Sequence, residues 1–324
     1  MLLIASIGSP ALWGGFLLFV LLMVALDLGV FHKQAHQVSL REAAGWSLVW
    51  VSLAGVFNLG VWWWFGPERA LEFTAGYVIE KALSVDNIFV FVVIFGALRI
   101  PAALQHRVLI WGIIGALVLR ALFIGLGTAL ISRFHWAIYV FGGILLITGI
   151  KLFFAGSEEP HPEKNPLVRL FRRIVPSTPM LHGQNFFVRE NGRLVSTPLL
   201  MALVTIEATD VVFAVDSIPA IFAVTLDPFI VFTSNIFAIL GLRALYFLLA
   251  GIIDRFHYLK YGLAFVLLFV GAKMVASDWV KVPILVSLTV IAVLLSGSIV
   301  ASLLRPRAEP EPPAAPPGPP AGVP

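Results

Sequence analysis

Long apolar stretches are the feature of this sequence that most limits what it can fold into. A helix needs about 20 apolar residues to cross a bilayer, and nine stretches near that length follow one another along the chain. Hydrophobic residues make up 59% of the 324 residues and charged residues only 12%, whereas a soluble domain is about 25% charged. So few charges cannot cover a water-soluble globule. The predicted fold class is all-α, a polytopic helical membrane protein whose spans are residues 10–31, 45–66, 74–98, 107–131, 135–155, 197–225, 228–253, 257–277 and 281–303.

Basic residues in the short loops predict how the chain lies in the membrane. Lys and Arg collect in every second loop, including residues 156–196, and the intervening loops hold few of them. Because basic loops stay on the cytoplasmic side, we expect a multi-pass protein of the bacterial cell membrane with its N-terminus outside and its C-terminus inside. The alternative for the first span is a cleaved signal peptide, but it lacks a basic start and a small-residue cleavage site.

The spans form one expected transmembrane domain, residues 1–303, interrupted by a cytosolic loop over about 156–196. Residues 304–324 are rich in Pro and Ala, which predicts a disordered cytosolic tail. Arg169, Arg172 and Arg173 form a small basic cluster in the loop. This cluster is either a determinant of orientation with no ligand, or a contact for phospholipid headgroups.

Two segments of the chain resemble each other. Leu-Arg-Ala-Leu-Phe at 119–123 returns as Leu-Arg-Ala-Leu-Tyr at 242–246, and two further tetrapeptides recur in the same order. The units run over about 74–155 and 197–277, with three spans in each. An odd number of spans makes the two copies cross the membrane in opposite senses, and such inverted repeats are typical of secondary transporters. A purely structural duplication is the alternative.

Five acidic residues lie within the third and sixth spans: Glu80, Asp86, Glu207, Asp210 and Asp216. Unpaired, they would oppose insertion by roughly 12–17 kcal/mol on a lenient scale. Lys81, Arg120 and Arg243 are the basic partners available, which leaves a deficit of about two positive charges. One divalent cation would supply this deficit, and so would proton uptake. The alternative, that all five carboxylates only form buried salt bridges, runs short of cations.

The chemistry of the remaining side chains limits which ion could bind. The chain has no Cys, and its seven His lie at or beyond the ends of the spans. An intramembrane site would therefore use oxygen ligands from the carboxylates, from backbone carbonyls, and from Asn87, Ser84, Ser217 and Thr209. Oxygen ligands suit Mg²⁺, Ca²⁺ and Mn²⁺. No cofactor and no nucleic-acid partner is expected.

Helical spacing alone does not bring these groups together. Positions six residues apart lie about 120° apart around a helix, so Glu207, Asp210 and Asp216 cannot face one point from a regular helix. Pro219 predicts a kinked or broken sixth span that would turn Asp216 toward a common cavity. Asp86 and Asp216 are the repeat-equivalent pair and the first choice as ligands, while Glu80 and Glu207 relay protons or pair with Lys81.

Three more polar residues lie within spans. Asp27, near the inner interface, is either a helix-end anchor or part of an ion path. Asn58 and Asn235 are expected to form hydrogen bonds between helices.

These motifs carry a resemblance to a known family. The chain is similar to the TerC family of integral membrane proteins, which belongs to a wider group of exporters with a LysE-like fold, over about residues 10–303. The matching segments are Glu80–Asn87, Ile206–Asp210, Ala214–Ala220, and Asp27-Leu28 followed by His32-Lys33. Members are named for tellurium resistance, and bacterial ones act as Mn²⁺ exporters. The resemblance implies that Asp86, Glu207, Asp210 and Asp216 are metal-associated positions.

The function expected from these observations is export of a divalent metal, Mn²⁺ by resemblance, in exchange for protons. The chain has no P-loop signature for ATP use, and the spans hold no His ligand or nucleophile–base pair, so an enzyme is not expected. A membrane-embedded metal-dependent enzyme and a factor that assembles or metalates other membrane proteins are the alternatives. The sequence alone does not rank Mn²⁺ above Ca²⁺ or Mg²⁺.

Overall fold

The computed structural model describes residues 6–31, 39–154, 166–190, 192–250, 256 and 258–305. These residues form a helical bundle with one short hairpin. The helices are α1 (Pro10–Phe31), α2 (Leu40–Phe65), α3 (Pro67–Ala97), α4 (Ala102–Arg133), α5 (Ala137–Phe154), α6 (Pro166–Ile174), α7 (Pro198–Phe222), α8 (Pro228–Leu240), α9 (Leu242–Leu249), α10 (Leu259–Val275) and α11 (Ile284–Leu304), and the strands are β1 (Phe187–Glu190) and β2 (Arg193–Ser196).

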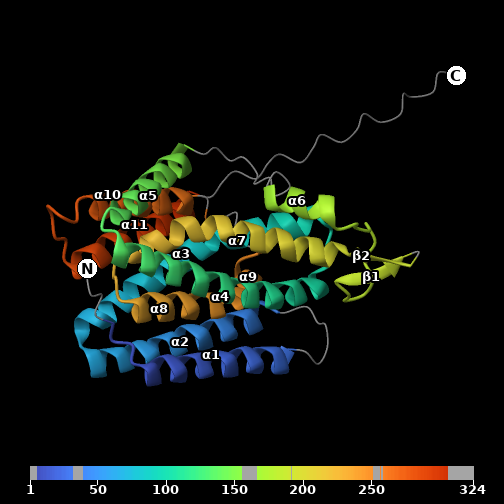
Figure 1. Cartoon of the computed structure of the whole chain (residues 1–324), viewed down its shortest axis with the longest axis horizontal. Helices are drawn as coiled ribbons and strands as arrows, with labels where there is room; N and C mark the ends of the chain where they lie inside the picture. The colour runs from blue at the N-terminus through green and yellow to red at the C-terminus, as the bar shows by residue number, and fades with distance from the viewer. Residues whose placement is uncertain are drawn as a thin grey trace, which may run out of the picture.

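The bundle is several helices thick. α1 and α2 form one edge, α5, α10 and α11 gather at the opposite edge, and α3, α4 and α7 lie between them (Figure 1). α3 packs against α7 and α8, and α4 packs against α7 and α8 as well. The two helices that carry the candidate acidic residues, α3 and α7, therefore pack against each other and against neighbouring helices.

The structure confirms a helical membrane protein but does not confirm nine spans. Each predicted span corresponds to a helix, with the seventh formed by α8 and α9 together. Within the described residues, five helices are long and apolar enough to cross a membrane, namely α2, α4, α5, α7 and α11, and the bent pair α8–α9 would be a sixth. α3 falls short because Glu80, Lys81 and Asp86 interrupt its apolar run, and α10 has only 17 residues.

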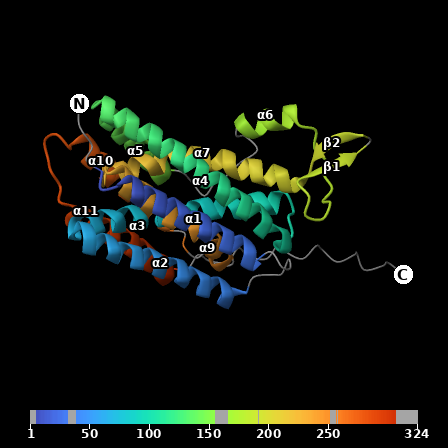
Figure 2. The same ribbon diagram turned by 60° about the horizontal axis from the view of Figure 1, so that its bottom comes forward.

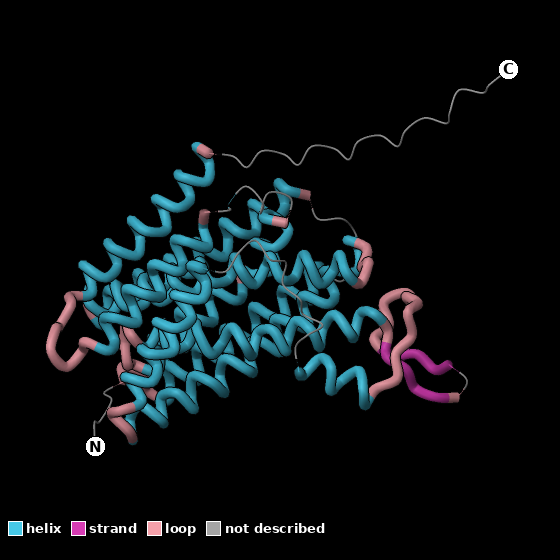
Figure 3. The backbone as a smooth tube through the Cα atoms, turned by 90° about the horizontal axis from the view of Figure 1, so that it is seen from above, coloured by secondary structure: helices cyan, strands magenta, loops and turns pink. Residues whose placement is uncertain are grey.

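α6 and the two strands project from one end of the bundle, called the hairpin end below (Figures 1 and 3). β1 and β2 are antiparallel, with Phe187 opposite Ser196 and Glu190 opposite Arg193. The all-α prediction is confirmed for the bundle, and this short hairpin is an addition that it did not include. The dipeptide Asn191-Gly192 is a typical signal for such a turn, and Gly192 has a φ of 78°, which favours glycine. The predicted Pro-rich tail lies almost wholly outside the described residues.

The opposite end of the bundle, called the Asp227 end below, is held by a polar network. Asp227 caps α8 by accepting hydrogen bonds from the backbone N–H groups of Phe229 and Ile230. The same carboxylate accepts hydrogen bonds from the Ser6 hydroxyl (3.0 Å) and the Ile7 N–H (2.8 Å). Asp227 thus ties the start of the described chain to the beginning of α8.

The helix break predicted at Pro219 is absent. α7 runs without interruption through Pro219 to Phe222, and α3 is also continuous. Pro219 lies in the last turn of α7, so little helix follows the hydrogen bond that it removes. The break lies instead in the seventh predicted span, where α8 and α9 meet at Gly241 with a bend of 43°.

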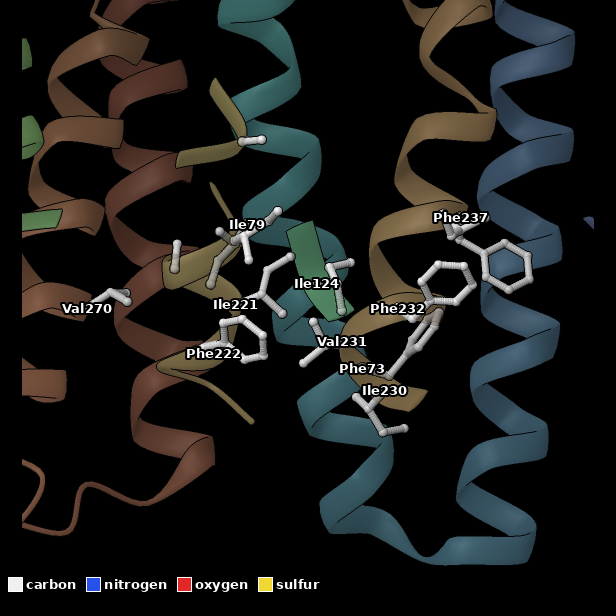
Figure 4. Packing of buried hydrophobic residues seen from close by; sticks show 14 of the residues in the cluster. Phe73, Ile79, Ile124, Ile221, Phe222, Ile230, Val231, Phe232, Phe237 and Val270 are labelled. Carbon is white, nitrogen blue, oxygen red and sulfur yellow. The ribbon is translucent and has the colours of Figure 1, made fainter. Parts of the chain in front are cut away.

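Aromatic side chains fill the space between α2, α3 and α8. The rings of Phe57 and Phe237 have centroids 4.9 Å apart, and Phe73 lies 5.3 Å from Phe57. Phe73, Phe232 and Phe237 gather on one side of this core, and Ile79, Ile221 and Phe222 lie on the other (Figure 4). Such aromatic contacts stabilise the packing beyond the apolar area that they bury.

Small residues bring α5 and α10 into backbone contact. A Cβ added to Gly142 would lie 3.1 Å from the carbonyl oxygen of Gly271. A Cβ added to Gly149 would lie 3.0 Å from the carbonyl oxygen of Ala264. Close backbone approach at small residues is a typical way for helices to associate in lipid, where apolar surface gives no preference for another helix.

The outer surface suits lipid. Leu17, Leu18, Leu21 and Leu22 of α1 are all exposed. At the Asp227 end, exposed tryptophans include Trp62, Trp63 and Trp64 at the end of α2, Trp136 before α5, and Trp279. Trp residues are enriched where a bilayer meets water, so these rings mark an interface.

One loop at the Asp227 end has an exposed acidic anchor. Asp278 accepts hydrogen bonds from the Tyr139 hydroxyl and from His135 Nε2 (3.0 Å). These two hydrogen bonds hold the pKa of the Asp278 carboxyl below its usual value.

The glycine contact between α5 and α10 is testable with two neighbouring residues. Gly142→Ala adds a Cβ only 2.7 Å from Cγ2 of Val275, and overpacking of this kind costs about 1–3 kcal/mol. We expect a lower melting temperature of the purified protein in detergent, measured by fluorescence or loss of monodispersity. Gly143→Ala is the matched control, because an added Cβ there has no neighbour within 4 Å. Equal melting temperatures for both variants would contradict the proposed packing.

Candidate functional site

A buried arginine connects the three central helices. The Arg120 guanidinium of α4 is 1% exposed and forms ion pairs with Glu80 of α3 at 2.8 Å and with Asp210 of α7 at 3.3 Å. It also donates a hydrogen bond to the Ser217 hydroxyl on α7. The pairing predicted for Arg120 is therefore present, and one cation is shared by two acidic residues.

Glu80 has partners on two further helices besides its own. Its Oε1 is close enough to Arg120 for an ion pair, but the geometry is not that of a hydrogen bond. Its Oε2 accepts a hydrogen bond from the Asn235 amide at 3.1 Å. Asn235 belongs to α8 and is fully buried. Glu80 therefore joins α3 to α4 and α8, and Asn235 forms the interhelical hydrogen bond expected of it. Asn58 does so too, donating to the Thr74 hydroxyl at 2.8 Å.

Near the Arg120–Asp210 ion pair, two buried carboxylate oxygens have no hydrogen-bond partner within the described residues. They are Oδ2 of Asp210 and Oε1 of Glu207, which lies one turn earlier on α7. The Glu207 carboxylate fits against α4 only because residue 115 is glycine. A Cβ at Gly115 would lie 2.2 Å from Oε1 of Glu207. Unsatisfied buried oxygens are costly and suit a bound cation or a proton.

The favoured pair, Asp86 and Asp216, lies in different surroundings. Asp216 accepts a hydrogen bond from the Thr148 hydroxyl of α5 at 2.8 Å. For the Asp86 carboxylate, no hydrogen bond or ion pair is found to any part of the chain that the structure describes. The two repeat-equivalent acids therefore differ: one is held by a neighbouring helix and the other is free to accept a ligand.

Among the described residues Lys81 forms no ion pair with a carboxylate, which was one of the two roles considered for Glu80 and Glu207. Its ammonium donates a hydrogen bond to the carbonyl oxygen of Ala238 at 2.9 Å, close to the α8–α9 break. A Cβ at Gly241 would lie 2.9 Å from the Lys81 nitrogen, so glycine leaves room for it. Carbonyls near a break lose their helical partners, and Lys81 satisfies one of them. This leaves the core with even fewer cations for its acids than the sequence suggested.

The structure does not gather the five acids into one cluster. Among the described residues, no group of three or more His, Cys, Asp or Glu side chains could hold a metal ion in this conformation. Arg243 and Asn87 are buried, as predicted for supporting residues. Ser84 and Thr209 donate to backbone carbonyls one turn earlier, so their hydroxyls are used locally. The side chain of Asp27 lies outside the described part.

Sequence reasoning missed two residues that shape the site. Thr148 was overlooked because a lone hydroxyl in an apolar span bonds its own helix more often than another. Gly115 was overlooked because its role depends on the distance between α4 and α7, which no local pattern encodes. What remains chemically is a buried, oxygen-rich layer, with Asp86, Glu207 and one oxygen of Asp210 available to a cation or a proton.

Arg120 should be essential for the fold. In Arg120→Gln, Glu80 and Asp210 lose their shared cation, and breaking a buried pair from one side costs about 3–5 kcal/mol. We expect a large fall in melting temperature, with partial recovery when Glu80→Gln is added. Arg133→Gln, an exposed position at the end of the same helix, is the control. A melting temperature like that of wild type for Arg120→Gln would refute the network.

Comparison with known proteins gives the family. A membrane protein of Myxococcus xanthus, STKORF319, is 64% identical over 94% of this chain and 96% of its own. A protein of Escherichia coli K12, provisionally named a membrane-bound redox modulator, Alx, is 50% identical over 88% of this chain and 92% of its own. No solved structure matches. The pattern of the integral membrane protein TerC family matches residues 65–309, which contain all five candidate acids, and the chain therefore belongs to that family.

Proposed function

We propose that this protein is a secondary transporter that exports a divalent cation from the bacterial cytoplasm. The observation that carries the proposal is the excess of carboxylates in the helical core. Of five acids on α3 and α7, only Glu80 and Asp210 form ion pairs within the described residues, and they share Arg120. A core that stays negative in lipid needs a cation or protons, and exchanging one for the other is transport. The family resemblance selects Mn²⁺ as the cargo.

Inverted repeats are the second part of the proposal. Several contacts support them. When each residue or helix in such a contact is replaced by its equivalent in the other unit, the result is another contact that the structure contains. α3 of the first unit packs on α8 of the second, and α7 of the second packs on α4 of the first. If Gly149 corresponds to Gly271, then Gly142 corresponds to Ala264, and the contacts Gly142–Gly271 and Gly149–Ala264 exchange as well. A two-fold axis in the membrane plane would produce this pattern.

The proposed topology has nine spans. α1, α3 and α10 join the six segments that satisfy length and composition. The 17 residues of α10 extend about 26 Å at 1.5 Å per residue, which a thinned bilayer accommodates at modest cost. The charges of α3 point at other helices rather than at lipid, as the contacts of Glu80 and Lys81 illustrate. The hairpin end, which carries most of the loop arginines, is the cytoplasmic end in this proposal.

The chemistry proposed for release uses the same carboxylates. A metal ligand must be ionised, so protonation of Asp86, Glu207 or Asp216 weakens metal binding. Entry of protons from outside would therefore release the metal there, and the protons would leave on the cytoplasmic side. In this mechanism the protein acts as a carrier and not as an enzyme. The redox name of its relatives does not extend to thiol exchange here, since the chain has no Cys.

Transport and its residues are tested in proteoliposomes. With the purified protein we expect Mn²⁺ flux that Asp86→Asn and Asp216→Asn abolish, because each removes a charged ligand. Asp278→Asn, an acid on an exposed loop, is the control and should transport normally. Ca²⁺ and Mg²⁺ in competition rank the ions. If both core variants transport like wild type, the assignment of these ligands is wrong.

Proton exchange is tested separately in the same vesicles. An imposed pH gradient, acidic on the side equivalent to the outside, should accelerate Mn²⁺ export, because protons displace the metal on that side. A pH-sensitive dye inside the vesicles should report proton movement in the opposite direction. Flux that is independent of the gradient would contradict proton coupling while leaving metal transport intact.

A further inference from the structure

The short helix α6 has two unlike faces. Val168 and Phe171 face the bundle and pack against Met201 and Ala208 of α7 and Leu98 after α3. Val168 is only 1% exposed, so this face anchors α6 to the long helices. α6 is therefore part of the folded protein and not a loosely attached segment.

The outward face of α6 combines basic and apolar residues. Arg169 and Arg173 lie one turn apart, and Leu170 and Ile174 lie one turn apart beside them. Leu170 is 55% exposed and Ile174 is 69% exposed. Neither arginine has an ion-pair partner among the residues that the structure describes. The outward face of α6 therefore presents positive charge and exposed apolar surface together, the combination found on helices that lie at a membrane surface.

The position of α6 indicates what covers this face. It lies along the first turns of α7 at the hairpin end, on the flank of the bundle (Figures 1 and 2). α7 is long and apolar enough to span a membrane, so its first turns lie where the acyl chains give way to headgroups. Residues on the flank at this depth meet lipid. Arginine binds phosphate with two parallel hydrogen bonds, and aliphatic side chains prefer acyl chains.

We propose that the outward face of α6 is a docking site for anionic phospholipids of the leaflet at the hairpin end. The guanidinium groups of Arg169 and Arg173 bind headgroup phosphates, and Leu170 and Ile174 insert among the upper acyl chains. The proposal requires that α7 spans the membrane, but it does not require that the protein transports a cation. It gives α6 a role beyond setting orientation, because it binds one class of lipid.

A competing explanation comes from the sequence just before α6. Glu158, Glu159 and Glu163 precede the helix and could neutralise its arginines without lipid. Under that explanation anionic lipid would have no effect on the protein, and the face would contact water. The two explanations therefore give opposite results when the lipid is changed.

The depth of α6 can be measured on the full chain by spin labelling. Because the sequence has no Cys, Leu170→Cys and Ile174→Cys each give a single labelling site. In vesicles containing phosphatidylglycerol, we expect these labels to be accessible to oxygen and protected from a water-soluble nickel complex. Leu122→Cys, exposed on α4 within a candidate span, is the lipid reference, and Asn185→Cys is the water reference. Labels at 170 and 174 that match the Asn185 reference would overturn the proposal.

The preference for anionic lipid is tested with two charge-matched variants. We expect phosphatidylglycerol to raise the melting temperature of the wild type above its value in phosphatidylcholine. Arg169→Gln with Arg173→Gln should abolish this shift, whereas Arg189→Gln with Arg193→Gln, the same loss of charge on the hairpin, should keep it. No shift in the wild type, or the same loss in both double variants, would overturn the proposal. Neither result depends on whether the protein moves a metal ion.

Discussion

The ion pairs of Arg120 are the interaction on which the central layer depends. The interior of a bilayer has no water to solvate a charge, so each buried acid needs a protein partner, a bound cation or a proton. Arg120 supplies that partner to Glu80 on α3 and Asp210 on α7 at once. Because Arg120 itself comes from α4, the three long central helices must associate before both acids are paired. These ion pairs stabilise the layer, and they require an acid on α3, an acid on α7 and a base on α4.

The two acids that the proposed repeats make equivalent have different surroundings. Asp86 and Asp216 occupy equivalent places in the two sequence repeats, yet only Asp216 has a hydroxyl partner, Thr148. The residue that corresponds to Thr148 in the second repeat is Val270, which is buried in the apolar core and offers no hydrogen bond. One carboxylate is therefore positioned by its neighbour and the other by its own helix alone. If the protein is the carrier proposed above, this difference would let one acid bind the ion more readily than the other.

Much of the fold was predictable because lipid imposes strict rules. In the part that the structure describes, each of the nine apolar stretches contains a helix. Arg120 was identified as a partner because so few cations were available for the buried acids. The errors arise where a residue acts through contacts distant in sequence. Pro219 suggested a broken sixth span, but its place in the last turn leaves α7 intact, and Gly241 breaks the seventh span instead. The charge of Lys81 suggested a pair with an acid, but its ammonium instead donates a hydrogen bond to the backbone carbonyl of Ala238. Neither outcome follows from local spacing.

The basic residues at the hairpin end and the acidic residues of the core are well separated along the bundle. Arg120 lies 18 residues after the start of α4, about 27 Å from the hairpin end at 1.5 Å per residue. Salt screens exposed charges over about 8 Å at physiological ionic strength, so the loop arginines act only near their own surface. Within the helices the dielectric is low, and an uncompensated carboxylate attracts a cation far more strongly than the same group would in water. In the proposed transporter the surface arginines would therefore set the orientation of the chain, while the acids of α3 and α7 would select a cation over an anion.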